Sequence, residues 1–333
     1  MQPLNRSDLR PLGLRVGELV EVRSAEEILA TLGTEGRLDK IPFMPEMLQF
    51  CGKRFRVYKA AHKTCDTILR SGLRHVEDAV HLEGLRCDGS SHGECDAGCL
   101  LFWKEQWLKR VEDTSAGASP VALDRVDIPL AVLMRNTRIV PNPANPADMV
   151  YSCQATCLRE FSTPLSAWNP WQYWRDWRSG NERIQDMLRA LLIGIFNTLQ
   201  RWRRGGQYPH LEGKCAGQTP ALSLNCEAGE IVEVRTKDEI METLNRRHRN
   251  RGLLFDREMV KYCGKPFPVL RRVRRIVDEV TGRMVEMPRD CIILDGVICK
   301  GDLDKFCPRS IYPYWREIWL RRPGEPSPPA ANS

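Results

Sequence analysis

The sequence lacks any apolar run long enough to cross a bilayer. A membrane-spanning helix needs about 20 apolar residues, and the apolar stretch Leu191–Phe196 is far shorter. The N-terminal segment, residues 1–20, also lacks the apolar run and the small-residue cleavage pattern of a secretory signal. We therefore predict a cytoplasmic protein without a membrane span.

The chain also lacks the short motifs that define common enzyme classes. It contains no Walker loop, no G-x-G-x-x-G, no G-x-S-x-G and no H-E-x-x-H sequence. These absences exclude the enzyme classes that such motifs identify. The sequence consequently assigns no catalytic residue and leaves open whether the protein is an enzyme.

Neither sign of charge dominates. The chain has 50 Lys and Arg residues against 43 Asp and Glu residues, which gives a net charge of +7. This mild basic bias permits contact with acidic polymers without requiring it, so a protein, a polyanion or a nucleic acid all stay open as partners. With 333 residues, 42% of them apolar, the chain exceeds what one hydrophobic core usually serves, and we expect two or three domains.

Cysteine, in contrast, is plentiful. The chain has 13 cysteines, an odd number, and disulfides are rare in a reducing cytoplasm. We therefore expect metal ligation, thiol chemistry or burial as small hydrophobic side chains rather than a disulfide framework.

The chain contains an internal repeat. With a constant offset and no gap, Gly17–Arg23 aligns with Gly229–Arg235, and Phe50 with Tyr262. The same register aligns further segments: Leu82–Cys87 with Leu294–Cys299, Cys95 with Cys307, and Trp103–Leu108 with Trp315–Leu320. Because this period is longer than that of solenoid units, we interpret residues 17–110 and 229–322, the first and the second repeat, as two homologous domains.

Each repeat has the pattern of a small α+β module. Alternating apolar residues predict a strand at its start. Capping boxes that begin at Ser24 and Thr236 predict short helices near 25–33 and 237–246. Each repeat closes with two Trp residues spaced i, i+4, which we interpret as one helical face. We predict two homologous β-rich modules, interpreted as SH3-like barrels with short capped helices.

A helical central segment joins the two modules. Apolar residues at three- and four-residue steps predict a helix over 182–204, capped by Asn181. The preceding Trp-rich stretch, 168–177, fits either core or domain-interface anchors, or a stacking surface for single-stranded nucleic acid or sugars. The predicted domains are the first cysteine-bearing module (1–113), a linker with the Trp-rich helical segment (114–206), the second module (207–322) and a disordered tail (323–333).

Each module can supply four sulfur ligands, enough for a zinc ion or, alternatively, an iron–sulfur cluster. The eight candidate metal ligands are Cys65, Cys87, Cys95 and Cys99 in the first module and Cys263, Cys291, Cys299 and Cys307 in the second. Neither module has paired Cys-x2-Cys knuckles, and only three cysteine positions recur in both repeats: Cys51/Cys263, Cys87/Cys299 and Cys95/Cys307. Burial as small apolar side chains therefore stays an alternative.

Three strings of the sequence resemble a family of bacterial cysteine-rich proteins with an internal duplication. They are Phe50–Tyr58, Tyr151–Thr156 and Cys307–Trp319, and the resemblance covers nearly the whole chain. It implies no known activity, and no catalytic residue is carried over from it.

Two functions follow as hypotheses. The first is a metal-binding, non-enzymatic accessory or interaction protein of the bacterial cytoplasm, in which zinc or a cluster staples the modules. The second is a metal- or thiol-dependent enzyme of a specialised biosynthetic pathway, with a site between the modules. That site would use the cysteines unique to one repeat or to the central segment: Cys65, Cys99, Cys153, Cys157 and Cys291.

Overall fold

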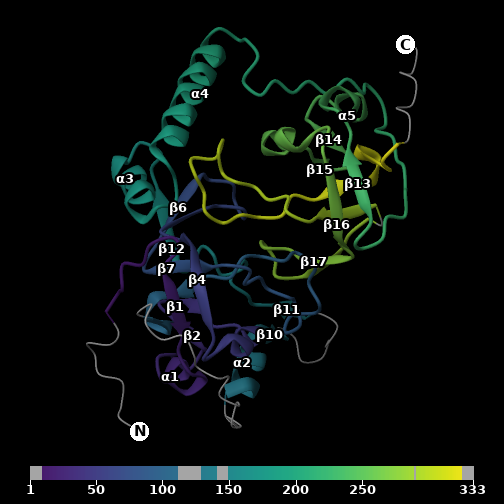
Figure 1. Ribbon diagram of the computed structural model, residues 1–333. Coiled ribbons are helices and arrows are strands. Elements are labelled where there is room, and N and C mark those ends of the chain that lie inside the picture. Colours follow the sequence, from purple (N-terminus) through teal and green to yellow (C-terminus); the bar gives the residue numbers. More distant parts are fainter. Residues whose placement is uncertain (1–9, 112–128, 141–148, 289, 325–333) are drawn as a thin grey trace. The chain divides into compact units, whose positions relative to one another are not determined.

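The computed structural model describes residues 10–111, 129–140, 149–288 and 290–324 (Figure 1). The chain forms two compact units. The first unit comprises Met1–Leu188, Arg275–Val285 and Lys300–Ile311, and the second comprises Arg189–Arg274, Glu286–Cys299 and Tyr312–Ser333. Two segments of the second repeat, 275–285 and 300–311, thus belong to the first unit. Residues 114–128 and 141–148 of the predicted linker segment and most of the predicted tail lie outside the described residues.

The first unit is built on an antiparallel five-stranded sheet in the order β8-β7-β4-β1-β9. Its strands are β1 (Leu19–Val22), β4 (Arg54–Ala60), β7 (Ala79–Leu82), β8 (Trp103–Lys104) and β9 (Leu108–Arg110). The alternation of apolar residues in β1 turns Val20 and Val22 into the core, where neither is exposed.

The second unit holds a sheet of the same strand order, β20-β19-β16-β13-β21. Its strands are β13 (Ile231–Val234), β16 (Pro266–Arg272), β19 (Cys291–Leu294), β20 (Trp315–Arg316) and β21 (Leu320–Arg321). The sequence repeat aligns the first residue of each of these strands with the first residue of its counterpart in the first sheet. The described strands form open sheets and no closed barrel, so the SH3-like interpretation finds no support among them.

Smaller elements complete the α+β fold. The remaining strands of the described chain are β2 (Arg37–Leu38), β3 (Ile41–Pro42), β5 (Lys63–Cys65), β6 (Leu73–Val76), β10 (Arg138–Ile139), β11 (Val150–Tyr151), β12 (Ser162–Leu165), β14 (Arg249–Asn250), β15 (Leu253–Leu254), β17 (Arg275–Val277) and β18 (Met284–Glu286). The helices are α1 (Ala25–Leu29), α2 (Pro129–Thr137), α3 (Pro170–Ser179), α4 (Ile184–Trp202) and α5 (Lys237–Thr243), with the 3-10 turns η2 (Pro45–Phe50), η3 (Glu105–Trp107), η4 (Arg257–Tyr262) and η5 (Glu317–Trp319).

Both predicted capping boxes are confirmed, but the helices they open are shorter than expected. The Ser24 hydroxyl accepts from the backbone of Glu27, and Thr236 does the same with Glu239. Each helix then stops near a threonine, since the hydroxyls of Thr31 and Thr243 donate to the carbonyl three residues back. The same hydroxyls accept the indole N–H of a buried tryptophan in each repeat.

The predicted helical face of the paired tryptophans is wrong. In each repeat the first Trp lies in a short strand and the second in a 3-10 turn. Trp103 and Trp107 are fully buried in the first core, and Trp315 and Trp319 in the second. A strand followed by one tight turn therefore brings both indoles inward, as a helix would have done.

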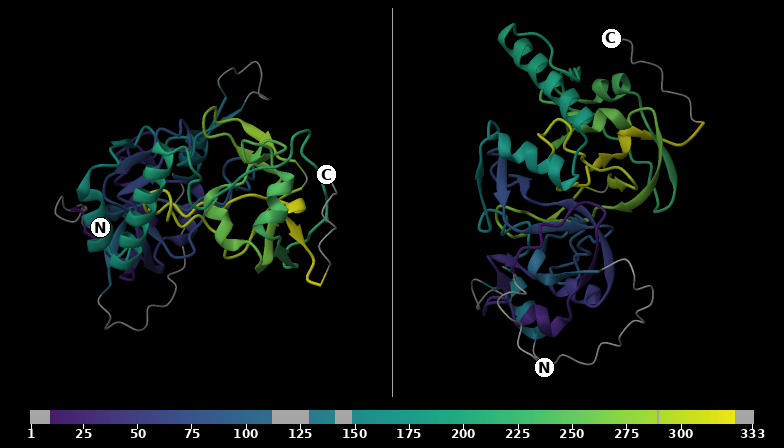
Figure 2. Two further views of the ribbon diagram at one scale, coloured as in Figure 1. Left: turned by 90° about the horizontal axis from the view of Figure 1, so that it is seen from above. Right: turned by 60° about the vertical axis from the view of Figure 1, so that its left-hand side comes forward.

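The long central helix is confirmed as α4, a single continuous helix in all views (Figure 2). Asn181 does not cap it; its side-chain amide instead bonds both the N–H and the C=O of Ala60, at 2.8 Å each. The tryptophans of the preceding segment, such as Trp168 and Trp171, are exposed, so they are not core anchors. No helix in the described ranges is long and apolar enough to cross a membrane.

Candidate metal centre

Three side chains of the first unit converge with metal-ligand atoms. Sγ of Cys87 lies 3.2 Å from Oε1 of Glu46 and 3.4 Å from Nε2 of His92. Nδ1 of His92 lies 3.7 Å from Oε1 of Glu46. One ligand atom from each of the three residues fits within a mutual distance of 4.8 Å. A thiol, an imidazole and a carboxylate at this spacing are the donor types that zinc takes in proteins.

Local backbone structure brings these residues together. Glu46 lies in the first turn of η2, which begins at Pro45. Cys87 and His92 flank a turn that is closed on the carbonyl of Gly89, which accepts from the N–H of His92 at 3.1 Å and of Glu94 at 2.9 Å. Gly89 has a φ of 78°, and a Cβ there would lie 2.3 Å from a backbone atom of the same loop. Glycine is therefore required for this tight loop.

Burial makes the Glu46 carboxylate unusual. Its residue is 6% exposed and His92 is 1% exposed. Glu46 forms no ion pair with any Lys or Arg of the described chain; its oxygens accept from the Cys87 thiol and the Ser91 hydroxyl. A buried carboxylate that only neutral donors satisfy is costly, and a bound cation would remove that cost.

The electrostatics of the centre favour neutral side chains in the absence of a cation. Burial, together with the negative charge of Glu46, raises the pKa of the Cys87 thiol well above its usual value. Burial lowers the pKa of His92, although Glu46 and Asp88 act in the opposite direction. The site therefore holds a thiol and an uncharged imidazole rather than an activated thiolate, and a metal ion is what would deprotonate the thiol.

A second group of potential ligands also lies in the first unit. It consists of Cys65, Asp304 and Cys307, whose ligand atoms again fit within 4.8 Å. The backbone N–H of Cys65 donates to Sγ of Cys307 at 3.1 Å. Two buried basic side chains, Lys63 and Arg309, interact electrostatically with this group. Their positive charge opposes binding of a further cation here.

The eight cysteines predicted as ligands have different surroundings. Cys87 belongs to the first group, and Cys65 and Cys307 belong to the second. Sγ of Cys95 accepts the backbone N–H of Val277 at 3.3 Å, and the carbonyl of Cys99 accepts the N–H of Cys87 at 2.8 Å. The remaining three lie in the second unit: Cys263 caps η4, Cys291 is buried in β19 and Cys299 is partly buried. None of these three joins a ligand group among the described residues.

Sequence reasoning did not include Glu46, His92 or Asp304 among the candidate ligands. The repeat register contained a usable signal. Glu46 recurs as Glu258 at the same offset at which Cys87 recurs as Cys299, and His92 aligns with Asp304. A carboxylate and a thiol therefore occupy matching positions in both repeats, and the third position is a histidine in the first repeat and a second carboxylate in the other.

Comparison of the chain with models of protein families, with curated proteins and with solved structures finds no match. The chemistry of the centre itself therefore supports the function proposed next.

Proposed function

We propose that this is a zinc-binding protein in which Glu46, Cys87 and His92 hold the ion. The observation that carries the proposal is the gathering of three different ligand types around one point, two of them almost fully buried. Zinc bonds such ligands at about 2.0–2.3 Å and accepts a water or a further group in its fourth position.

The ligand types support zinc rather than an iron–sulfur cluster. A cubane cluster takes four thiolates, whereas the first group offers one thiol and the second group two. Between the two groups, the absence of a buried Lys or Arg pairing with Glu46 in the described chain favours the first. The second group lies beside Lys63 and Arg309 and is the weaker candidate.

The role that fits this centre is a structural staple in a duplicated, non-enzymatic accessory protein. Zinc at Glu46 and His92 would fix the loop that follows β7 to η2, and the same loop presents Cys95 to the backbone of Val277. The raised pKa of Cys87 weighs against the alternative of a thiol-dependent enzyme, since the thiolate is the reactive form. Of the five cysteines proposed for an enzyme site, Cys291 lies in the second unit and the other four in the first.

The test is the zinc content of protein purified without chelator, compared across matched variants. We expect about one tightly held zinc per chain, lost in Glu46→Gln, Cys87→Ser and His92→Gln. Cys263→Ser is the control, since this cysteine lies outside both groups, and it should keep the zinc. Cys307→Ser should also keep it. Wild-type protein without zinc, or full zinc in all three site variants, would overturn the proposal.

A further inference from the structure

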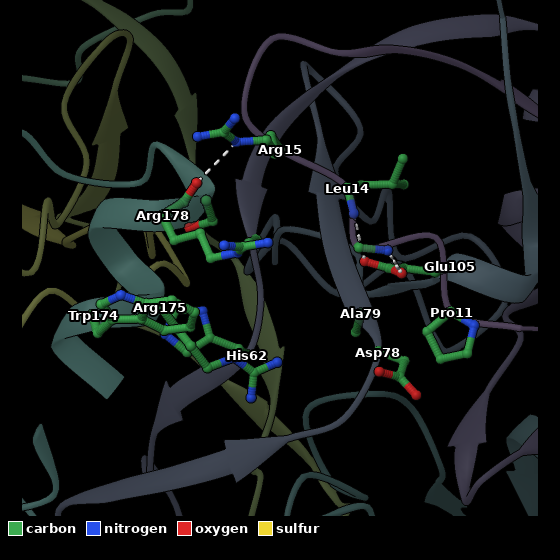
Figure 3. A pocket seen from close by; sticks show the side chains of 13 residues that line it. Pro11, Leu14, Arg15, His62, Asp78, Ala79, Glu105, Trp174, Arg175 and Arg178 are labelled. Atoms are coloured by element: carbon green, nitrogen blue, oxygen red, sulfur yellow. Dashed lines mark hydrogen bonds between the residues drawn. The ribbon is translucent and has the colours of Figure 1, made fainter. Parts of the chain in front are cut away.

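A cavity of about 320 Å³ lies in the first unit, and none of the three candidate zinc ligands lines it (Figure 3). One wall is the helix α3, which contributes Trp174, Arg175 and Arg178. The segment before β1 contributes Arg15, and the loop before β5 contributes His62. None of these residues belongs to either ligand group.

Three guanidinium groups line this cavity without a carboxylate partner among the described residues. Arg15 donates through Nε to the carbonyl of Arg178 at 2.9 Å, which holds it beside the helix (Figure 3). The guanidinium of Arg178 stacks over the ring of Trp174, 5.1 Å from its centroid. Arg175 makes no hydrogen bond or ion pair with the described residues. Guanidinium groups that line one cavity are typical of sites for phosphate and carboxylate groups.

The buried imidazole of His62 adds a directed hydrogen-bond acceptor. Its Nε2 faces two acceptors, Oδ1 of Asp176 at 3.2 Å and the carbonyl of Gln172 at 3.3 Å, so the ring proton resides there. Nδ1 is buried and has no hydrogen-bond partner in the described chain. Burial lowers the pKa of His62, so the ring is neutral and Nδ1 keeps its lone pair. A ligand with a hydroxyl group would satisfy it.

The lining also carries two carboxylates, Asp78 and Glu105, and that of Glu105 is already satisfied. Glu105 accepts the backbone N–H groups of Gly13 at 2.7 Å and Leu14 at 3.1 Å (Figure 3). Its counterpart in the second repeat, Glu317, accepts backbone N–H groups in the second unit in the same way. The Glu105 charge therefore serves to hold the chain before β1. The three arginines outnumber the two carboxylates of the lining, which leaves an excess of positive charge in the cavity.

We propose that this cavity binds a small hydroxylated phosphate ester, with the phosphate on Arg15, Arg175 and Arg178 and a hydroxyl donating to Nδ1 of His62. The phosphate dianion matches three guanidinium groups that lack a carboxylate partner in the described chain better than a single carboxylate does. The cavity has room for a small metabolite rather than for a polymer.

Isothermal titration of the full-length protein with glycerol 3-phosphate, inorganic phosphate and glycerate tests the proposal. Glycerol 3-phosphate should bind most tightly, inorganic phosphate more weakly because it lacks the neighbouring hydroxyl, and glycerate most weakly. Arg175→Gln and Arg178→Gln should each weaken glycerol 3-phosphate binding roughly tenfold to hundredfold, as expected for loss of one charge-assisted contact. Arg183→Gln is the matched control, since this exposed arginine does not line the cavity.

Both arginine variants replace exposed side chains and should keep the fold. Failure of all three probes to bind would overturn the proposal, and so would equal affinity in the arginine variants and the control. Tighter binding of glycerate than of the phosphate ester would overturn the assignment of phosphate. Since no residue is shared with the metal centre, the zinc measurement and this titration can fail independently.

Discussion

The backbone N–H of Cys65 donates a hydrogen bond of 3.1 Å to Sγ of Cys307. A matching bond of 3.3 Å runs in the opposite direction, from the N–H of Val277 to Sγ of Cys95. The sequence repeat aligns Val277 with Cys65, and Cys307 with Cys95. In each repeat, the thiol at this position thus accepts a hydrogen bond from the backbone N–H at one fixed, equivalent position of the other repeat. Both bonds lie within the first unit. This reciprocal exchange gives a physical reason why this cysteine occurs in both repeats.

Replacing the accepting thiol tests this exchange. Cys307→Ala should leave the Cys65 N–H without an acceptor and cost about 1 kcal/mol of stability, whereas Cys307→Ser keeps a polar atom and should cost less. Amide hydrogen exchange at Cys65 would report the loss directly. Cys215→Ala, a change outside this junction, is the control. Unchanged exchange at Cys65 in Cys307→Ala would show that the thiol is not an effective acceptor.

A buried arginine contacts a second pair of side chains that occupy equivalent positions in the two repeats. Arg309, 3% exposed, donates to Thr67 at 2.5 Å and to Glu279 at 3.0 Å, and Glu279 is the counterpart of Thr67 in the second repeat. Burial acts to lower the pKa of Arg309, but Glu279 together with nearby thiols raises it above its usual value, so the guanidinium stays charged.

Glu279→Ala should therefore destabilise the protein by roughly 2–3 kcal/mol, because it leaves a buried guanidinium without its counter-charge. The double variant Glu279→Ala with Arg309→Met should recover part of this loss, since no unpaired charge is then buried. Thermal denaturation of the two variants measures the difference. A double variant less stable than the single one would show that the pair stabilises by packing rather than by charge.

His81 should make stability depend on pH. It is fully buried, donates through Nδ1 to the carbonyl of Leu101 at 2.8 Å, and burial lowers its pKa to about 4. Below the unfolded pKa of about 6.5 the unfolded chain binds a proton that the folded chain refuses, so stability falls as pH drops from about 6.5 towards 4. The total loss is roughly 3 kcal/mol.

The second repeat offers the matched variant for this prediction, because Ile293 occupies the equivalent buried position. His81→Ile should remove this part of the pH dependence. Urea unfolding at pH 7.5 and pH 5 for both proteins is the measurement. An equal drop in midpoint in the two proteins would assign the pH dependence to other groups.

Removing zinc should loosen the loop that follows β7. With the ion gone, the amides of His92 and Glu94, which both donate to Gly89, should exchange at least about tenfold faster. The amide of Ala61, which donates to Ala79 in the same unit, should be unaffected. Equal exchange at all three amides before and after chelation would contradict a stapling role.

Much of the local structure could be predicted from the sequence. The capping boxes at Ser24 and Thr236 and the apolar periodicity of α4 report structure within a few residues. Both boxes and the helix are found, although α4 spans Ile184–Trp202 and Asn181 does not cap it. The sequence predicts a longer α1 than the structure has, because the hydroxyl of Thr31 competes with backbone N–H groups for the last carbonyls of the helix.

The candidate metal centre could be predicted only in part. Cys87 and His92 are close in sequence, but Glu46 reaches them from η2, and its role depends on tertiary packing that periodicity does not encode. Likewise, the pattern of each repeat reports its own strands. It does not indicate that segments 275–285 and 300–311 of the second repeat belong to the first unit.

X-ray absorption at the zinc edge of the purified protein tests the central claim most directly. The proposed centre predicts one sulfur at about 2.3 Å and otherwise only nitrogen or oxygen neighbours at about 2.0–2.2 Å, with the sulfur contribution lost in Cys87→Ser. A first shell of two or more sulfurs, or an unchanged sulfur contribution in Cys87→Ser, would contradict a zinc ion held by Glu46, Cys87 and His92.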